Sequence, residues 1–505
     1  MTSVHRVIFF LALALCGSCQ KPEPEKNIEP PNIIFIETDD LTAKYLGSFG
    51  AEWAKTPNID CIASNGVLFE NAVVQGTSCT PSRNSLITSL YPHNLNLYEN
   101  EDLVALPKGI WTFPKALQQV GYKTIWVGKN HLLPDAKGLN AKNPITYKNK
   151  GLQIEMGFDN VYQTYGRSMV LDIAIKQYQK DTIWKKGQDA YADFLFENNL
   201  LDQFMKEGYV KNTTLDPDTE AMDGYFTSIA IDRMKLYKDD GPFFLWLNFT
   251  GPHPPFNVNQ KYHDLYNFKD MPSPINSMYE NYMAPNELKH SLVPKSVKAM
   301  NGYRKRYAAS IASVDAQVGR ILDYLNNAEL TDNTVIVFFS DHGIMTGDHG
   351  TLGKYTLYKE VLNPALIISH LGNYTPRREQ TAMELIDLGK TVLEIAGANE
   401  TTLSQVPSGS SLLPLLDNSR SFEGPGVGIS ELKNLRSIFN GEYKYIDHPE
   451  TPLLFNLKEN PDETENRMEQ EKEVALQLKN KLDQIISASQ SNNIFPENPK
   501  NANQQ

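Results

Sequence analysis

From residue 32 onward the chain alternates short apolar runs with segments of amphipathic, helix-like spacing. Four apolar runs predict buried strands, at residues 32–37, 123–127, 242–249 and 334–339. Helical spacing and end signals predict helices at residues 57–64, 113–120, 303–326 and 382–395. Strands that alternate with helices are typical of a parallel sheet. The pattern therefore predicts an α/β fold with a large, mostly parallel sheet flanked by helices.

The pattern changes after about residue 418, where the chain becomes more polar. Residues 436–446 predict an antiparallel hairpin that turns at Asn440-Gly441, and residues 469–487 predict an amphipathic helix. The final polar segment is predicted to be a disordered tail. We therefore expect a catalytic domain over 32–417, a smaller C-terminal α+β subdomain of antiparallel strands and a helix over 418–489, and a tail over 490–505.

The first residues have the pattern of an export signal. His5 and Arg6 precede an unbroken apolar run at 7–15, which is too short to span a membrane as a helix. Small residues then precede Cys19, and the Pro-, Glu- and Lys-rich residues that follow form a tether up to residue 31. This resembles a bacterial lipoprotein signal, with a signal peptide at 1–18 and lipidation of Cys19. Ordinary cleavage and release is the alternative.

Composition narrows the classes of partner and compartment. The 505 residues include 48 basic and 60 acidic side chains, so the net charge is 48 − 60 = −12, and there is no long basic run. This argues against nucleic acid as a partner. The four cysteines are too few for a disulfide-rich scaffold, and we expect Cys61 to be a buried apolar residue. Membrane contact is expected through the lipid anchor only, which places the exported protein at the periplasmic or outer face of a bacterial membrane.

Ionisable residues gather directly after the four predicted strands. They are Asp39 and Asp40, then Lys129 and His131, then His253, and finally Asp341 and His342. Each cluster alone is more often a turn, a helix cap or a structural histidine. Because ligands bind at the carboxyl ends of strands in open α/β sheets, four such clusters together favour one shared site.

The residue types in these clusters suit a cation and an anion. Three carboxylates and an imidazole have the inventory for a divalent cation, namely Asp39, Asp40, Asp341 and His342. Positive or proton-donating groups for an anion come from Lys129, His131, His253 and a further residue, Lys354.

Cys79 lies in the segment G-T-S-C-T-P-S-R-N-S-L at residues 76–86. Pro81 suits the first turn of a helix, so we expect Cys79 just before a helix N-terminus. The helix dipole there favours an anion and lowers the pKa of a thiol. The alternative is that Cys79 is a small buried hydrophobe, but its polar neighbours Thr80, Ser82 and Arg83 make that less favourable.

The segment C-T-P-S-R at 79–83 resembles the C-x-P-S-R signature of the type I, formylglycine-dependent sulfatases of the alkaline-phosphatase superfamily. The resemblance spans nearly the whole mature chain. Its other segments are P-N-I-I-F-I-E-T-D-D at 31–40, T-P-N-I-D at 56–60, G-K-N-H at 128–131, G-P-H-P-P at 251–255, S-D-H-G-I-M-T-G-D-H-G-T-L-G-K at 340–354 and L-F-N-L-K-E-N-P-D-E-T-E-N at 454–466. The resemblance implies an alkaline-phosphatase/sulfatase-like fold and a bacterial polysaccharide sulfatase lipoprotein.

The resemblance also implies the chemistry. A maturation enzyme would oxidise Cys79 to formylglycine, whose hydrate has one hydroxyl to attack sulfur and a second to expel sulfate. The implied catalytic residues are Cys79, Arg83, Lys129, His131, His253 and Lys354. The implied metal ligands are Asp39, Asp40, Cys79, Asp341 and His342. Oxygen ligands favour Ca²⁺, while the imidazole leaves Mn²⁺ as an alternative.

Two positions depart from the family pattern. Many sulfatases carry Asn where this chain has His342, and the cysteine signature usually ends in Gly where this chain has Ser89. Since Cys79, Pro81 and Arg83 are intact, we expect maturation to survive the change at Ser89.

The expected substrate is a sulfated carbohydrate, such as ulvan, carrageenan, fucoidan or a glycosaminoglycan like heparan or chondroitin. The rim residues Tyr165, Arg167 and Tyr262 are expected to set which sugar is accepted. A phosphodiesterase or phosphonate monoester hydrolase that uses the same aldehyde is the alternative enzyme. A glycan-binding lipoprotein without catalysis is disfavoured, because no expected catalytic position is altered.

Overall fold

The computed structural model describes residues 30–100, 102, 106–107, 109–132, 155–168, 170–171, 189–207, 212–276 and 296–493. The predicted signal peptide, Cys19 and nearly all of the tether lie outside these residues. Among the described residues, no helix is both long and apolar enough to cross a membrane.

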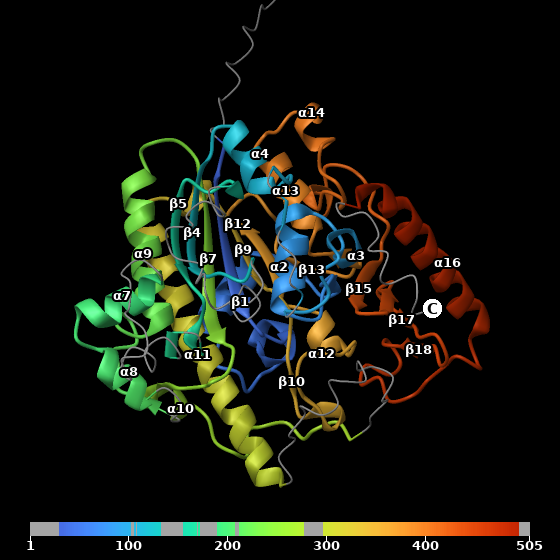
Figure 1. Cartoon of the computed structure of the whole chain (residues 1–505), viewed down its shortest axis with the longest axis horizontal. Helices are drawn as coiled ribbons and strands as arrows, with labels where there is room; N and C mark the ends of the chain where they lie inside the picture. Colours follow the sequence, from blue (N-terminus) through green and yellow to red (C-terminus); the bar gives the residue numbers. More distant parts are fainter. Residues whose placement is uncertain are drawn as a thin grey trace, which may run out of the picture.

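An eight-stranded sheet forms the centre of the molecule (Figure 1). Its strand order is β13 (Arg377–Glu379), β2 (Gly66–Phe69), β12 (Leu366–His370), β9 (Thr334–Ser340), β1 (Asn32–Asp39), β7 (Phe243–Pro252), β4 (Lys123–Lys129) and β5 (Asn160–Thr164). Only β12 runs antiparallel to its neighbours. The predicted mostly parallel sheet is confirmed, and the four predicted strands are its four adjacent strands β9, β1, β7 and β4.

Helices cover both faces of this sheet, which explains why its strands are continuously apolar. On β1, Ile33 and Phe35 belong to one core, and Ile34 and Ile36 belong to the other. One face is covered by α1 (Pro57–Ser64), α9 (Met222–Tyr237) and α11 (Val297–Asn327). The opposite face is covered by α2 (Cys79–Thr88), α4 (Phe113–Gln119) and α13 (Asp387–Ile395).

Apart from the C-terminal sheet and its helix, which are described below, the other described elements are short. They are β3 (Ala72–Val73), α3 (Pro92–Leu95), α7 (Ala190–Glu197), α8 (Leu201–Glu207), β6 (Asn212–Thr213), β8 (Val258–Asn259), α10 (Gln260–His263), β10 (Met345–Thr346), β11 (Leu352–Gly353), α12 (Lys359–Leu362), β14 (Met383–Glu384), α14 (Glu400–Leu403) and α15 (Leu413–Asp417), with 3-10 helices at Ala43–Tyr45, Gly47–Phe49, Thr331–Asn333, Asp348–Gly350 and Gln490–Asn492.

Three local predictions need correction. The predicted helix at 382–395 begins only at Asp387, because Met383 and Glu384 pair as strand β14 with β3. The predicted helix at 303–326 is longer and begins at Val297. Cys61 is exposed rather than buried, because α1 turns Ile59 and Ile62 towards the core and Cys61 away from it.

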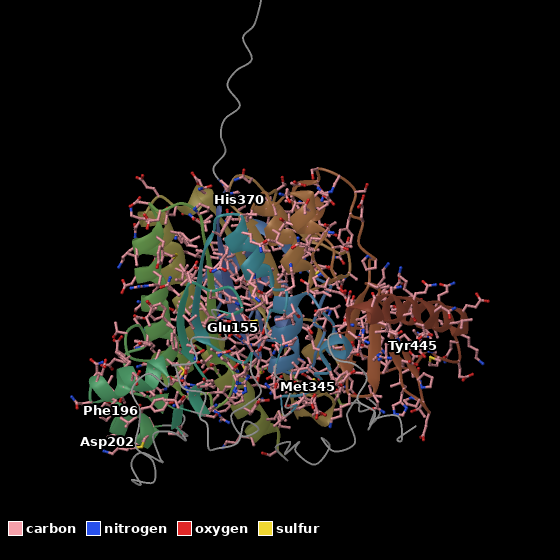
Figure 2. The ribbon with its side chains drawn as sticks, turned by 45° about the horizontal axis from the view of Figure 1, so that its top comes forward. Glu155, Phe196, Asp202, Met345, His370 and Tyr445 are labelled. Carbon is pink, nitrogen blue, oxygen red and sulfur yellow. The ribbon has the colours of Figure 1, made fainter. Side chains whose placement is uncertain are left out.

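The C-terminal part forms a separate antiparallel sheet beside the main one, at the right of Figure 1. Its strands are β15 (Gly428–Leu432), β16 (Leu435–Phe439), β17 (Tyr443–Asp447) and β18 (Leu453–Asn456), and α16 (Lys472–Ser489) packs against β16 and β17. The predicted hairpin and helix are confirmed. In Figure 2, Tyr445 of this sheet and Phe196 of α7 lie on opposite sides of the molecule.

The start of the predicted disordered tail is ordered. Residues Gln490–Asn492 form a 3-10 helix, and the Asn492 side chain donates a 2.9 Å hydrogen bond to the carbonyl of Pro407. The tail prediction for residues 494–505 lies outside the described residues.

Candidate active site

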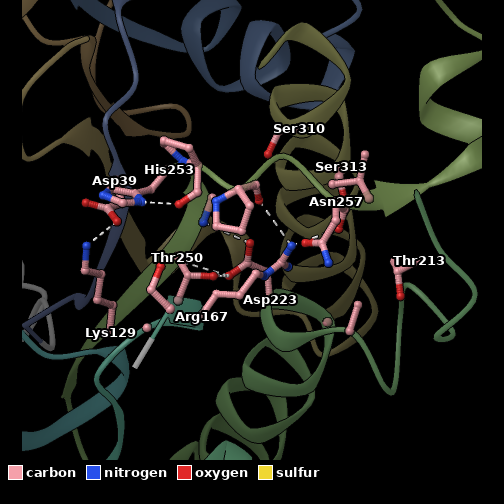
Figure 3. Close-up of a pocket in the computed structure, with 18 of the residues that line it drawn as sticks. Asp39, Lys129, Arg167, Thr213, Asp223, Thr250, His253, Asn257, Ser310 and Ser313 are labelled. Carbon is pink, nitrogen blue, oxygen red and sulfur yellow. Dashed lines mark hydrogen bonds and ion pairs between the residues drawn. The ribbon is translucent and has the colours of Figure 1, made fainter. Parts of the chain in front are cut away.

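The predicted clusters lie together at one edge of the main sheet, where β1, β4, β7 and β9 end. Thr38 is paired with Ser340 and Asp39 with Pro252, so the residues that follow each strand emerge side by side. They border a pocket of about 260 Å³ (Figure 3). The predicted residues on its lining are Asp39, Lys129, His131, His253 and Lys354.

Cys79 is fully buried and is the first residue of α2, one position further into the helix than predicted. Its Sγ lies 2.9 Å from Lys354 Nζ and 3.3 Å from His342 Nε2. Asp39 Oδ1 is 3.4 Å away and Lys129 Nζ is 3.9 Å away. Burial alone would raise the pKa of this thiol, but the charges of Lys129 and Lys354 outweigh burial and lower it to about 5. The fold thus places a stabilised anion at position 79.

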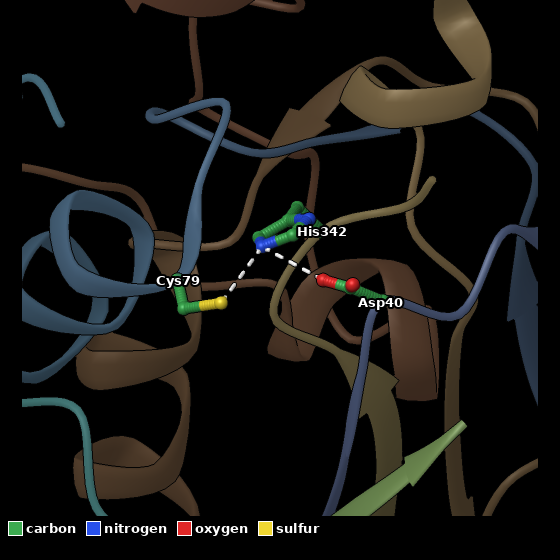
Figure 4. Close-up of side chains that lie close together, drawn as sticks. All are labelled: Asp40, Cys79 and His342. Atoms are coloured by element: carbon green, nitrogen blue, oxygen red, sulfur yellow. Dashed lines mark hydrogen bonds and ion pairs between the residues drawn. The ribbon is translucent and has the colours of Figure 1, made fainter. Parts of the chain in front are cut away.

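The candidate metal ligands surround Cys79 in two overlapping groups. Asp40, Cys79 and His342 form one group, and Asp39, Cys79 and Asp341 form the other, each with ligand atoms within 4.8 Å of one another. Figure 4 shows the first group, in which His342 Nε2 is 3.4 Å from Asp40 Oδ1. His342 Nδ1 lies 2.7 Å from the Gly343 carbonyl, so Nε2 is the atom that faces the centre. Buried carboxylates around one imidazole suit a divalent cation.

Two lysines and a histidine lie beside Asp39, the last residue of β1, and Asp40, which follows it. Lys129 forms an ion pair with Asp39, and Lys354 Nζ lies 3.0 Å from Asp40 Oδ1. His253 Nε2 lies 3.6 Å from Asp40 Oδ2, and 31% of its side chain is exposed. Burial raises the pKa of Asp40, but Lys354 and His253 outweigh burial and hold it well below its usual range. The two carboxylates therefore differ, because burial outweighs Lys129 at Asp39 and raises the pKa of Asp39 to about 6.

Arg83 lies behind Cys79 and contacts two residues that sequence reasoning missed. Its Nε donates to Asp341 Oδ2 at 2.9 Å, and its Nη1 donates to Asn248 Oδ1 at 3.0 Å. The same Nη1 is 3.3 Å from Glu37 Oε1. Burial raises the pKa of Glu37 to about 8. The available signal was Glu37 at the end of the first predicted strand and Asn248 within the third.

Two of the three residues that were predicted to form the rim lie on the outer wall of the pocket. Tyr165 and Arg167 line the pocket. Tyr262 does not, because it lies in α10 with its ring packed into the core, where it is only 5% exposed. Asp223 on α9 was missed, and no local sequence motif marks it. Its carboxylate accepts hydrogen bonds from the backbone N–H groups of Thr250 (2.8 Å) and Gly251 (3.0 Å), and so it holds the strand that leads to His253.

Comparison with known proteins identifies the family. The profile of the family described as Sulfatase matches residues 31–398. This is most of the chain, and the protein therefore belongs to the sulfatase family. It is a hydrolase of sulfate esters, built on the fold that the sequence predicted.

Two relatives and one solved structure show the breadth of this similarity. The chain is 27% identical to the multifunctional alkaline phosphatase superfamily protein PehA of Trinickia caryophylli, over 86% of this chain and 90% of the relative. It is also 27% identical to the N-acetylglucosamine-6-O-sulfatase of Bacteroides thetaiotaomicron, over 81% of this chain and 74% of the relative. A protein solved with its substrate D-glucosamine-2-N,6-O-disulfate shares the fold, with a TM-score of 0.67, 20% identity and coverage of 93% and 100%.

Proposed function

We propose that this enzyme removes sulfate from a sulfated carbohydrate, with Cys79 converted to formylglycine as its nucleophile. The observation that carries the proposal is the convergence of Lys354, His342, Asp39 and Lys129 on Cys79 Sγ, within 2.9 to 3.9 Å. A relative named as an N-acetylglucosamine-6-O-sulfatase supports a sugar substrate. So does the fold neighbour that was solved with a disulfated glucosamine.

Formylglycine would supply a hydrated aldehyde, in which one hydroxyl attacks sulfur and the other allows sulfate to leave. A formylglycine-generating maturation enzyme is therefore a required partner. The cations around position 79 stabilise the negative charge that develops there. Lys129 and Lys354 are in direct reach of the residue, while Arg83 holds Asp341 from behind. His131 lines the same pocket and is assigned as the base for sulfate release.

Asp39, Asp40, Asp341 and His342 would hold a divalent cation together with residue 79. When bound, the cation polarises the nucleophile and binds a sulfate oxygen. We propose Ca²⁺, because three of the four protein ligands are carboxylates. Mn²⁺ is the second candidate, because imidazole suits softer metals. Chelation should lower both activity and the thermal midpoint, and readdition of Ca²⁺ should restore both more fully than Mn²⁺ does.

His253 is assigned to protonate the leaving alcohol. It is partly exposed, and its Nε2 faces Asp40 at 3.6 Å. This places the imidazole between the buried carboxylates and the open pocket, where the alcohol would depart. An imidazole is suited to such a proton transfer near neutral pH.

We further propose that the enzyme is exported as a lipoprotein anchored through Cys19, facing the periplasm or the cell surface. The amino-terminal signal pattern supports this. Replacement of Cys19 by Ser should release the protein from the membrane fraction. If it instead stayed with the membrane, the anchor would not be Cys19.

The proposed function is tested by sulfate release from a panel of defined sulfated oligosaccharides. The wild-type enzyme, matured in a host with the maturation enzyme, should release sulfate from at least one member, and Cys79→Ala should not. Mass spectrometry of the peptide that contains residue 79 should detect the aldehyde. Full turnover by Cys79→Ala, or an intact thiol in the active enzyme, would disprove the mechanism.

The second candidate function is hydrolysis of phosphodiesters or phosphonate monoesters. The observation that favours it is the fold shared with the solved phosphonate monoester hydrolase of Agrobacterium radiobacter, with a TM-score of 0.72, 21% identity and coverage of 91% of this chain and 96% of that one. Rates on an aryl sulfate and on the matching aryl phosphodiester separate the two candidates. We expect the sulfate to react faster, and a clear preference for the phosphodiester would reverse the assignment.

A further inference from the structure

The pocket beside Cys79 extends to a second wall on which Arg167, Asp223 and Asn257 meet. Arg167 follows β5, Asp223 lies in the first turn of α9, and Asn257 follows β7. Figure 3 shows Asp39 and Lys129 on one side of Thr250, and Asn257 on the other. Because the proposed reaction occurs at the Asp39 side, this second wall faces the remainder of the substrate.

Arg167 uses only part of its hydrogen-bonding capacity within the described residues. Its Nη1 donates to the carbonyl of Asn257 at 2.8 Å and to that of Pro255 at 3.4 Å. Neither Nε nor Nη2 of Arg167 has a hydrogen-bond partner among the described residues. No carboxylate of the described residues lies within 4.0 Å of the Arg167 guanidinium. A guanidinium has five N–H donors in a planar fork. Most of these donors are therefore free to bind a ligand.

Asp223 is the carboxylate whose charge acts most strongly on Arg167, but it is already engaged. It accepts hydrogen bonds from the N–H and the hydroxyl of Thr250, both at 2.8 Å, and from the N–H of Gly251 at 3.0 Å. Burial lowers the pKa of Arg167, yet an arginine in a protein remains charged. The second wall thus holds a cation that its own chain balances only in part, which favours an anion in the pocket.

Asn257 provides an independent sign of a ligand on the same wall. The residue is only 3% exposed, and its Nδ2 donates to the carbonyl of Glu207 at 3.1 Å. Its buried Oδ1 has no hydrogen-bond partner among the described residues. A buried acceptor without a partner is unfavourable unless a ligand satisfies it. A sugar hydroxyl is a suitable donor.

We propose that Arg167 binds a second anionic group of the substrate sugar, either a carboxylate or another sulfate, and that Asn257 Oδ1 accepts a hydroxyl of the same sugar. The assignment rests on the proposed function for the sulfate that reacts beside Cys79. The preferred substrate is accordingly a sugar with two anionic groups, one at each wall. A planar guanidinium can bind either anion through two parallel hydrogen bonds.

The test compares dissociation constants, measured by titration calorimetry, within matched pairs of sugars. One pair is D-glucosamine-2-N,6-O-disulfate against N-acetylglucosamine-6-sulfate. The other is a 2-sulfated uronic acid against the corresponding 2-sulfated neutral hexose. The wild-type enzyme should bind the dianionic member of at least one pair about 10- to 100-fold more tightly. The pair that shows the preference identifies the second group as sulfate or carboxylate.

Arg167→Gln should reduce this preference to about threefold or less, and Arg167→Lys should retain part of it. Because each ratio is taken within one protein, a general loss of fold does not imitate the effect. Arg420→Gln removes the same charge from a surface pair with Glu394, outside the pocket lining, and should keep the wild-type ratio. No preference in either pair, or a preference that survives in Arg167→Gln, would overturn the assignment.

Sulfate release from 4-nitrophenyl sulfate by the wild-type enzyme separates this inference from the proposed function. If release fails while the dianionic preference remains, the proposed mechanism at Cys79 is wrong and the anion subsite stands. If release succeeds while the preference is absent, the subsite is wrong and the hydrolase assignment stands.

Discussion

Two of the buried clusters of charged side chains in the described part of the chain use their charges differently. The first surrounds Cys79, and we call it the catalytic cluster after its proposed function; it consists of Asp39, Asp40, Cys79, Lys129, Asp341, His342 and Lys354. The second, which we call the structural cluster, consists of Lys44, Arg304, Asp348, Glu360, Lys444 and Glu463. Both contain buried carboxylates with cations beside them, and 32% of the Lys44 side chain is exposed.

In the structural cluster each cation binds a group of the chain itself. Arg304 donates to Asp348 Oδ1 at 2.9 Å and to the Thr346 carbonyl at 2.8 Å. Lys44 pairs with Asp348 and with Glu360. Lys444 pairs with Glu463, both from the C-terminal part, and donates to the Leu357 carbonyl of the main domain at 2.6 Å. These contacts hold distant segments together.

In the catalytic cluster the cations converge on one atom beside a pocket. Lys354 and Lys129 both approach Cys79 Sγ, at 2.9 and 3.9 Å. Their charges are therefore available to a reacting group, whereas those of the structural cluster are used within the fold. Burial and charge alone therefore do not distinguish the two roles, but the direction of the cations does. Substitutions should accordingly separate stability from activity.

The largest expected effect is on stability, at Lys444. Lys444→Met leaves the Glu463 carboxylate buried without its cation, which should lower the free energy of unfolding by about 3–5 kcal/mol. Urea denaturation measures this change. The double variant Lys444→Met/Glu463→Leu removes the unpaired charge and should recover most of the loss, while kcat/KM of the folded protein stays near the wild-type value. If Lys444→Met were as stable as the wild type, the structural cluster would not stabilise the fold in the way that we propose.

The next effect is on activity, at Lys354. Lys354→Met removes a cation beside the reacting residue and should lower kcat/KM on an aryl sulfate by about 10² to 10³, or about 3–4 kcal/mol. The free energy of unfolding should change by less than half the loss in Lys444→Met, because Asp40 keeps its contacts with His342 and His253. Lys458→Met, at an exposed lysine, is the control and should change neither quantity. If Lys354→Met lost as much free energy of unfolding as Lys444→Met does, the two clusters would not differ in the way that we propose.

A third prediction concerns a buried carboxylate that has no cation partner among the described residues. Asp315 accepts hydrogen bonds from the N–H groups of Asn58 (3.0 Å) and Ile59 (2.8 Å), and burial raises its pKa to about 6 from an ordinary 3.8. The folded state therefore binds this proton more tightly than the unfolded state. The stabilisation is fully present below about pH 4 and is lost as pH rises through about 6, with a magnitude of up to about 3 kcal/mol.

Unfolding free energies at pH 4.5 and 7.5 for wild type and Asp315→Asn should reveal this contribution as a difference between the two proteins. The contribution of Asp348, in the structural cluster, should depend on pH in the opposite direction. Burial raises its pKa, but Lys44 and Arg304 outweigh burial and lower it. Its stabilisation is present above the ordinary pKa and is lost as pH falls, so Asp348→Asn should remove an acid-sensitive contribution. If the unfolding free energies of the two variants depended on pH in the same way, the opposite pKa shifts that we assign to Asp315 and Asp348 would be wrong.

The smallest effect is expected at Ser89, the C-cap of the helix that carries Cys79. Its backbone is left-handed, with φ 51° and ψ 41°, a conformation that favours glycine. Its hydroxyl donates only a long 3.4 Å hydrogen bond to the Ile386 carbonyl. Ser89→Gly should raise the free energy of unfolding by about 1 kcal/mol or less, with kcat/KM unchanged, as thermal denaturation and steady-state kinetics can show. A loss of stability would mean that the hydroxyl bond outweighs the backbone strain.

Local sequence patterns were sufficient for the four adjacent strands β9, β1, β7 and β4 of the main sheet and for the convergence of charges at its edge. The apolar runs that became β1, β4, β7 and β9 are continuous, because both faces of each strand are buried. The residues after them, such as Asp39 and Asp341, meet because neighbouring parallel strands end at the same edge. The parallel direction and the order of the strands thus bring residues from separate parts of the sequence into one site.

Features that depend on distant partners could not be predicted in this way. Met383 and Glu384 were expected in a helix, yet they pair with β3, about three hundred residues earlier. Asn248 was missed because its function is to accept a hydrogen bond from Arg83, 165 positions away. Tyr262 and Cys61 were misplaced because the facing of a short helix depends on the surface against which it packs. In each case the deciding contact is not local in sequence.

The position of β1 also has a consequence for biosynthesis. Its two neighbours in the sheet are β7 and β9, and Thr38 donates its hydroxyl hydrogen bond to Phe339, 301 positions further along. As the chain is made from its amino terminus, the segment N-I-I-F-I-E would leave the ribosome long before either neighbour exists. An unpaired apolar strand of this kind is prone to aggregate. Chaperones that keep the nascent or translocating chain unfolded should therefore act first on residues 32–37.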